Sequence, residues 1–334
     1  MDAAGTPEAS DTTETTESTE TTATNASPEP RRRRLPFWAP VLIGVASAVF
    51  GLLPWLITGM RLPLQNLWAT DAPPDQYPLV LLPFSQYAIT LIAAIMIVGA
   101  AIAGIVARAT RERLPRFGAA AIVIGVLAVQ VIATVQTSIV VRGGLQERGE
   151  SALYLAALVA GTSFAIVVGV LVLLLIARAP KAGAVIGLSI AAIAFGPWVN
   201  GLVVPFGTAG TTDVAWLLDV TRWIPPVLIG AAIAWGGVNT VGRVLAAAFA
   251  LLALWVAPAV MTAISNAVGS RALARYPAEM LDYGLDVFGM ALWIPELALP
   301  PLIVAVAVAV IGLIGRTIVT RRRSRAEQAE PLPR

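Results

Sequence analysis

Long apolar runs alternate with short polar connectors along most of this chain. Each run is long enough for an α-helix to cross about 30 Å of hydrocarbon. A backbone inside a membrane must satisfy its own hydrogen bonds, which a helix does within one segment. The pattern therefore predicts an all-α integral membrane protein, a polytopic bundle of about eight transmembrane helices. The runs cover residues 37–60, 87–108, 118–141, 152–177, 183–206, 223–241, 244–268 and 297–318.

The connectors differ in charge, and the difference alternates along the chain. Basic residues gather in 31–34, 108–116, 178–181 and 316–325, with Arg243 between the sixth and seventh runs. The intervening connectors are acidic or mixed. Because cytoplasmic loops are enriched in Lys and Arg, we expect both termini in the cytoplasm, which requires an even number of spans.

Proline, tryptophan and glycine recur at the ends of the runs. Residues 50–55 read Phe-Gly-Leu-Leu-Pro-Trp, and residues 195–198 read Phe-Gly-Pro-Trp. Several pairs of runs also close on a basic residue. This recurrence indicates four helical hairpins in series, and hairpins of two spans would repeat in parallel orientation. The alternative is that these residue types are simply common at span ends.

The two ends of the chain differ in composition from its middle. Residues 1–34 are predicted to form a disordered, acidic, Thr/Glu-rich cytoplasmic tail, because they have too little apolar area to fold. The tail ends in a tetra-Arg flank that we expect to contact anionic lipids of the inner leaflet. Residues 35–320 form the eight-span domain, and residues 321–334 a basic cytoplasmic tail. The flank consists of Arg31, Arg32, Arg33 and Arg34.

Composition narrows the chemistry. The chain is 57% hydrophobic and 13% charged, against about 25% charged in soluble domains. It has no cysteine and no histidine, which excludes disulfides, thiolate chemistry and the usual zinc and haem ligands. We expect no cofactor. Because its basic residues flank the spans, we also expect no nucleic-acid partner. The preference for Arg, with Lys181 the only lysine, points to a GC-rich bacterial, actinobacterial source.

No Asp, Glu, Lys or Arg occupies the middle of any run. Ion-coupled carriers generally need an ionisable group within the membrane, despite a cost of about 2.5–3.5 kcal/mol or more. The sequence therefore argues against a proton- or sodium-coupled carrier. Backbone and amide groups remain available for a neutral substrate.

The clearest polar stripe lies on the third run. Gln130, Thr134 and Ser138 recur every four residues and share one helical face. They either line a polar path or form hydrogen bonds between helices, and we favour the second because such bonds are common in membrane bundles. The seventh run carries a similar cluster, interpreted in the same way: Thr262, Ser265 and Asn266.

Acidic residues of the predicted outer loops are the other candidates. Asp71 and Asp75 lie in the first outer loop, and a short amphipathic helix after Pro277 should present its acids on one face and its apolar side to the membrane interface. Polyprenyl-phosphate-dependent transferases also place catalytic acids in their first outer loop. The acids of the predicted helix are Glu279, Asp282 and Asp286.

No phosphate-binding Gly-rich loop, nucleophile elbow or metalloprotease motif appears in the sequence. We therefore expect a multi-pass plasma-membrane protein that acts as a non-enzymatic subunit or scaffold of the bacterial envelope. One alternative is a permease for a small neutral or lipid-like substrate. The other is a polyprenyl-phosphate-dependent transferase that uses its outer-face carboxylates.

Overall fold

The computed structural model describes residues 35–64, 67–70, 73–206, 214–270, 273 and 276–329, the last seven by their backbone alone. The chain divides into two units, Met1–Arg33 and Arg34–Arg334, and every described residue belongs to the second. The predicted N-terminal tail and its tetra-Arg flank, Arg31–Arg34, lie outside the described residues.

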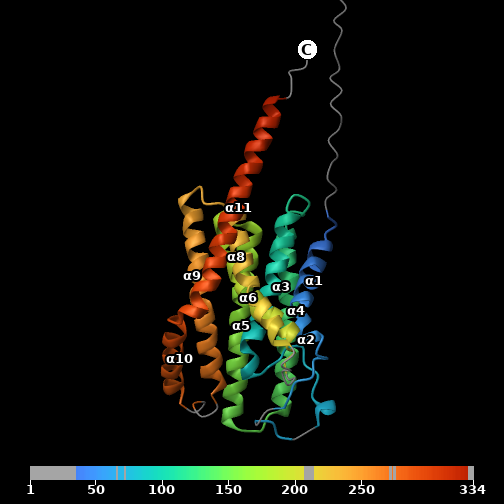
Figure 1. Cartoon of the computed structure of the whole chain (residues 1–334). Helices are drawn as coiled ribbons and strands as arrows, with labels where there is room; N and C mark the ends of the chain where they lie inside the picture. Colours follow the sequence, from blue (N-terminus) through green and yellow to red (C-terminus); the bar gives the residue numbers. More distant parts are fainter. Residues whose placement is uncertain are drawn as a thin grey trace, which may run out of the picture. The chain divides into compact units, whose positions relative to one another are not determined.

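The described part of the chain is helical and has no β-strand. The prediction of an all-α membrane bundle is confirmed (Figure 1). Seven helical segments are long and apolar enough to cross a membrane, and α1 is a shorter apolar helix. The helices are α1 (Ala39–Gly51), α2 (Leu53–Leu56), η1 (Pro74–Gln76), η2 (Gln86–Ala88), α3 (Ile89–Ala109), α4 (Gly118–Gly144), α5 (Gly149–Arg178), α6 (Lys181–Val203), α7 (Ala215–Thr221), α8 (Ile224–Gly236), α9 (Val241–Gly269), α10 (Pro277–Leu292) and α11 (Pro295–Ala329).

The first predicted span is divided where a proline interrupts its hydrogen bonds. Pro54 has no N–H, and the next amide, that of Trp55, donates to the carbonyl of Leu52 instead of to Gly51 (2.9 Å). The carbonyl of Gly51 accepts from the indole Nε1 of Trp198 instead (2.8 Å). The two Phe-Gly segments seen in the sequence thus meet, and Phe50 stacks on Trp198 with ring centroids 5.3 Å apart.

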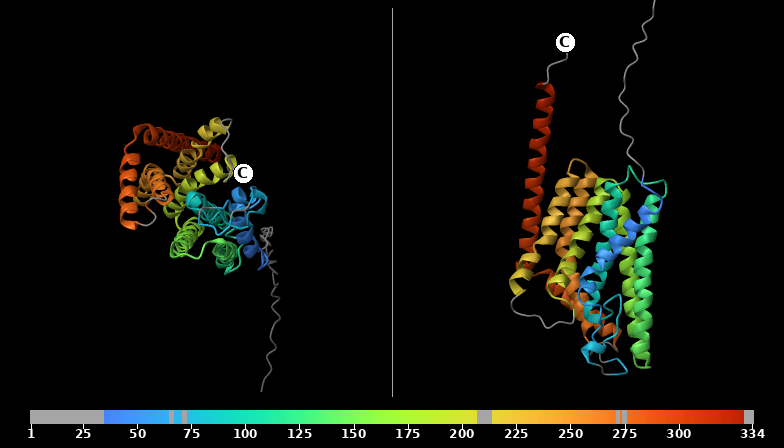
Figure 2. Two further views of the ribbon diagram at one scale, coloured as in Figure 1. Left: turned by 90° about the horizontal axis from the view of Figure 1, so that it is seen from below. Right: turned by 90° about the vertical axis from the view of Figure 1, so that its right-hand side faces the viewer.

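The second half of the bundle repeats the packing order of the first. α1 packs against α3 and α4, and α3 packs against α5; in the same way α6 packs against α8 and α9, and α8 against α11. Figure 2 shows the two halves on different sides of the bundle, with α6 also touching α3 and α5. The repeating unit is therefore four helices, or two of the predicted hairpins, in parallel orientation.

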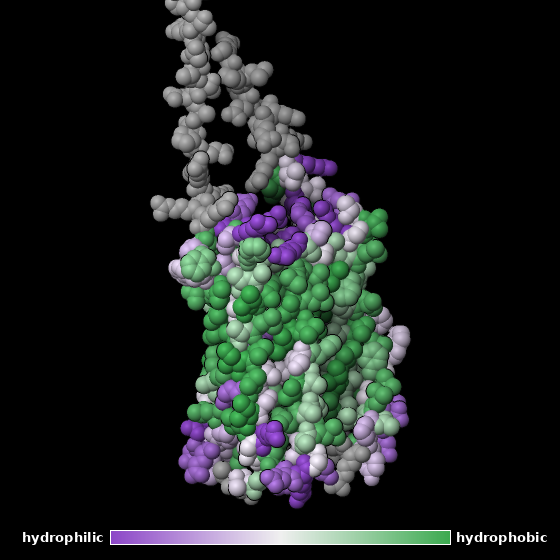
Figure 3. Space-filling view, turned by 180° about the vertical axis from the view of Figure 1, so that it is seen from behind, coloured by the Kyte–Doolittle hydropathy of each residue, from purple (hydrophilic) through white to green (hydrophobic). Residues whose placement is uncertain are grey.

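The bundle has two chemically different ends. The connectors 110–117, 179–180 and 237–240 join helices at the end that we call the basic end. The connectors 57–85 and 145–148, with the segments that follow α6 and α9, lie at the long-loop end. One face of the molecule shows an apolar belt between two polar rims, as expected for a surface in contact with lipid (Figure 3).

At the long-loop end, the described residues of 57–85 pack against α2 and α4 as a strap. Its backbone is held by side chains of α4: Leu81 N donates to Gln136 Oε1 (2.9 Å), and Leu82 N to Thr137 Oγ1 (3.0 Å). The indole of Trp55 donates to the carbonyl of Val80 (2.8 Å). Buried apolar side chains of the strap extend the core of the first half: Leu62, Val80, Leu82 and Phe84.

The predicted helix after Pro277 is present as α10, which runs antiparallel to the neighbouring half of α9. Gly284 faces Ala267, and the rings of Trp293 and Trp255 meet edge to face at 5.8 Å. The Trp255 indole also donates to the carbonyl of Leu292 (3.1 Å). α10 thus lies along α9.

Candidate functional site

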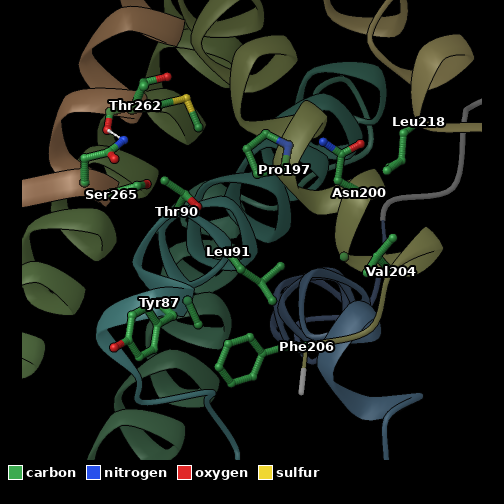
Figure 4. A pocket seen from close by; sticks show the side chains of 14 residues that line it. Tyr87, Thr90, Leu91, Pro197, Asn200, Val204, Phe206, Leu218, Thr262 and Ser265 are labelled. Carbon is green, nitrogen blue, oxygen red and sulfur yellow. Dashed lines mark hydrogen bonds between the residues drawn. The ribbon is translucent and has the colours of Figure 1, made fainter. Parts of the chain in front are cut away.

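A cavity lies at the long-loop end, between the ends of α3, α6, α7 and α9. Its volume is about 580 Å³, which is within the range of small-molecule sites. Figure 4 shows Asn200 on one side, Thr262 and Ser265 on the other, and Thr90 between them. The lining residues are Tyr87, Ala88, Thr90, Leu91, Pro197, Asn200, Gly201, Val204, Phe206, Leu218, Met261, Thr262, Ser265 and Asn266.

α8, which packs against α6 beside this cavity, is much shorter than α9. α8 has 13 residues and extends about 20 Å, whereas α9 has 29 and extends about 43 Å. α8 ends at the basic end and is preceded by α7, and the two together, Ala215–Gly236, are long enough to cross a membrane. The Thr221 hydroxyl at the end of α7 lies 3.1 Å from Asn200 Oδ1 and ties this turn to α6. In the first half, apolar side chains of the strap pack into the core at the same end.

Several polar groups of the pocket are available to a ligand. Several hydroxyls within the helices donate to the carbonyl four residues earlier, as Thr162 and Ser189 do. Within the described part of the chain, the side-chain hydroxyls of Thr262 and Ser265 make no such bond. The amide nitrogen of Asn200 likewise has no hydrogen-bond partner among the described residues, although its oxygen faces Thr221. Asn200 and Thr262 are exposed.

The pocket has no formal charge among the described residues that line it, since it contains no Asp, Glu, Lys or Arg. The nearby start of α8 adds little positive potential, because Pro225 and Pro226 remove two of the amide donors that a helix normally presents there. Pro225 lies against Gly196, one helical turn before Asn200. The arrangement suits a neutral ligand that offers hydroxyl, carbonyl or ether groups together with apolar surface.

The predicted stripe on α4 lies away from this pocket, and its side chains are hydrogen-bonded within the helix packing. Gln130 is 3% exposed, and its Nε2 donates across the helix interface to the carbonyl of Met96 on α3 (2.9 Å). Thr134 and Ser138 donate to carbonyls of their own helix, those of Gln130 and Thr134 (both 2.7 Å). Among the described residues, Gln130 is the one member of the stripe whose side chain bonds to another helix, and none of the three lines the pocket at the long-loop end.

The candidate acids are spread over separate elements. Asp75 lies in η1 within the strap, whereas Glu279, Asp282 and Asp286 are exposed on α10, which packs against α9. Asp71 lies outside the described residues. No carboxylate of these four makes an ion pair with the described part of the chain, and no group of three metal-ligating side chains occurs there.

The sequence analysis singled out one polar cluster of the pocket wall but did not predict a pocket there. The cluster of Thr262, Ser265 and Asn266 was read as packing between helices, but the structure places it on the pocket wall. Asn200 and Tyr87 were missed. The available signal was Asn200 itself, an amide at the end of an apolar run and directly after the Phe-Gly-Pro-Trp segment.

Comparison with known proteins gives no further guide to this site. No protein-family model matches the chain, and no match is found among curated proteins or solved structures.

Proposed function

We propose that this multi-pass membrane protein binds a small neutral or lipid-like molecule in the pocket between α3, α6, α7 and α9, as part of a permease. The observation that supports the proposal is the uncharged polar pocket beside Asn200, at the junction of the two four-helix halves. A pure scaffold needs no such vacancy. The filled α4 stripe, by contrast, fits a structural role for the first half.

The physical argument rests on the cost of unsatisfied polar groups. Moving an amide or hydroxyl without a hydrogen-bond partner from water into hydrocarbon costs several kcal/mol. Asn200 and Thr262 are exposed within the apolar bundle, so we infer that water or a ligand occupies the space between them. A ligand with a hydroxyl and a short apolar body would replace that water while keeping the hydrogen bonds.

We propose that the basic end faces the cytoplasm of the cell and the pocket faces outward. The positive-inside rule supports this orientation. Reporter fusions after Pro73 and Arg148 should behave as external, and fusions after Arg113 and Asn239 as cytoplasmic. Alkaline phosphatase activity of the fusions reports an external position, and fluorescence of fused green fluorescent protein reports a cytoplasmic one. An external signal after Asn239 would contradict the proposed orientation.

The pocket itself can be tested with single cysteines, because the chain has none of its own. We expect Asn200→Cys and Thr262→Cys to react in intact cells with a small membrane-impermeant thiol reagent, since both positions are exposed on the pocket wall. Thr134→Cys is the matched control, because Thr134 is 8% exposed and remote from the pocket. The labelled fraction is measured by mass spectrometry.

Neutral competitors then test binding. Glycerol and a monoacylglycerol should be compared for their ability to slow the labelling of Asn200→Cys. Equal labelling at Asn200 and Thr134, or none at Asn200, would show that no aqueous pocket exists there. Labelling that neither competitor slows would reject binding of this class of molecule.

A further inference from the structure

A second, apolar groove runs along the junction of α3, α6 and α8. Its volume is about 270 Å³, and it is open toward the side of the bundle. On α3 it extends from Val98 to Ile105, a distance of about 10 Å along the helix. Every described side chain that lines it is apolar: Val98, Ala101, Ile102, Ile105, Leu188, Ala191, Ala192, Phe195, Leu228 and Ala232.

Toward the basic end, each of the three helices has a polar or aromatic residue on the face that lines the groove. On α3, Arg108 lies three residues beyond Ile105 and therefore on the same face. On α6, Lys181 lies seven residues before Leu188, again on the groove face. On α8, Trp235 lies three residues beyond Ala232. Two cations and one indole therefore lie beyond the groove toward the basic end, on the helix faces that line it.

The three side chains are in contact. The guanidinium carbon of Arg108 lies 5.1 Å from the ring centroid of Trp235, and the ammonium of Lys181 lies 6.0 Å from it. Trp235 remains 42% exposed. The structure thus places a cationic pair around an aromatic side chain, a combination that is common where protein meets lipid headgroups.

The site is held in place from neighbouring helices. Arg108 Nη1 donates to the carbonyls of Ile176 (2.7 Å) and Ala179 (3.0 Å) at the end of α5. Arg316 of α11 donates to the carbonyl of Trp235 (3.0 Å), which fixes the end of α8. The ammonium of Lys181 has no hydrogen bond to the described part of the chain, so helix capping accounts for Arg108 and Arg316 but not for Lys181.

We propose that this groove is a binding site for an anionic phospholipid. One acyl chain lies along α3, α6 and α8, and the headgroup phosphate is held by Arg108 and Lys181 beside Trp235. The apolar lining excludes a hydrophilic ligand from the groove, and the two cations select a negative headgroup over a zwitterionic one. The proposal is independent of the outer pocket, because it involves the opposite end of the bundle.

The test compares lipid retention by native mass spectrometry. Delipidated full-length protein is incubated with mixed micelles that contain phosphatidylglycerol or phosphatidylcholine with the same acyl chains. The wild type should retain phosphatidylglycerol preferentially. The double variant Arg108→Gln/Lys181→Gln should retain it roughly 30-fold less, given the attraction expected for two cations. Arg111→Gln, at an exposed position of the same end, is the control for charge and should retain lipid as the wild type does.

Two further variants separate lipid binding from loss of folding and from simple anion binding. Lys181→Gln alone breaks no hydrogen bond to the described residues and should still lower retention. Ala191→Phe fills the groove and should abolish retention while both cations remain.

Unchanged retention in Lys181→Gln or Ala191→Phe would overturn the proposal. So would an equal loss in Arg111→Gln, which would indicate nonspecific attraction. Displacement by millimolar inorganic phosphate would show that the site binds phosphate without the acyl chain, and would also overturn it.

Discussion

Replacing Gly125 with valine is expected to separate α1 from α4 and to destabilise the protein by about 3 kcal/mol or more. A Cβ at Gly125 would overlap the carbonyl oxygen of Val41, and one at Gly44 would overlap that of Ile122. Backbone atoms cannot move aside as a flexible side chain does. The two helices therefore approach closely only because both positions lack a side chain. Thermal unfolding in detergent, followed by circular dichroism and by aggregation, measures the loss.

The matched control lies in the same helix. Gly143 has no neighbouring atom within 4 Å of an added Cβ, so Gly143→Val should change stability by no more than about 0.5 kcal/mol. A wild-type melting temperature in Gly125→Val would mean that the α1–α4 contact is looser than the structure indicates. Equal losses in the two variants would attribute the effect to valine itself.

Trp198→Ala is expected to cost about 3–5 kcal/mol. Trp198 is 4% exposed, stacks on Phe195 and Phe50 with centroids 5.1 and 5.3 Å away, and satisfies the carbonyl of Gly51. Its removal leaves a cavity and an unsatisfied carbonyl at the break between α1 and α2. Trp198→Phe keeps a ring but loses the hydrogen bond, so it should cost about 1–3 kcal/mol.

Denaturant unfolding of the purified variants in micelles gives the three free energies. Trp216→Ala is the control, because Trp216 is 66% exposed on α7 and its loss should have little effect. If Trp198→Phe were as damaging as Trp198→Ala, the hydrogen bond would dominate. If both were neutral, the aromatic contact would not join α6 to the first span.

The sequence was sufficient for the continuous spans, because each must be apolar along its whole length. The predicted run 118–141 begins at the first residue of α4, and 152–177 lies within α5. The break in the first span was less evident. Pro54 was visible, but whether a proline bends or divides a helix depends on which group donates to the freed carbonyl. That donor, Trp198, is 147 residues from Gly51 in sequence.

The candidate site was harder to predict for the same reason. The pocket requires that the ends of α3, α6 and α9 be neighbours, and hydropathy does not report which helices touch. The polarity of Thr262 and Asn266 was visible in the sequence, but a polar face has the same pattern whether it packs or lines a cavity. The start of α8 was predicted to within one residue, because the sixth run begins at 223, but the run extends to 241 whereas α8 ends at Gly236.

The even number of helices in each repeated unit has a consequence for how such a chain can arise. A unit that enters and leaves at the same end can be fused to a second copy without inverting it, whereas an odd unit would turn the second copy over. The joint then needs only a residue or two, and Ala179-Pro180 is all that separates α5 from α6. After such a tandem fusion, one copy can diverge in sequence while the other preserves the architecture. The strap on the first half, and the pocket beside the ends of α6 and α9, are differences of the kind that such divergence would leave.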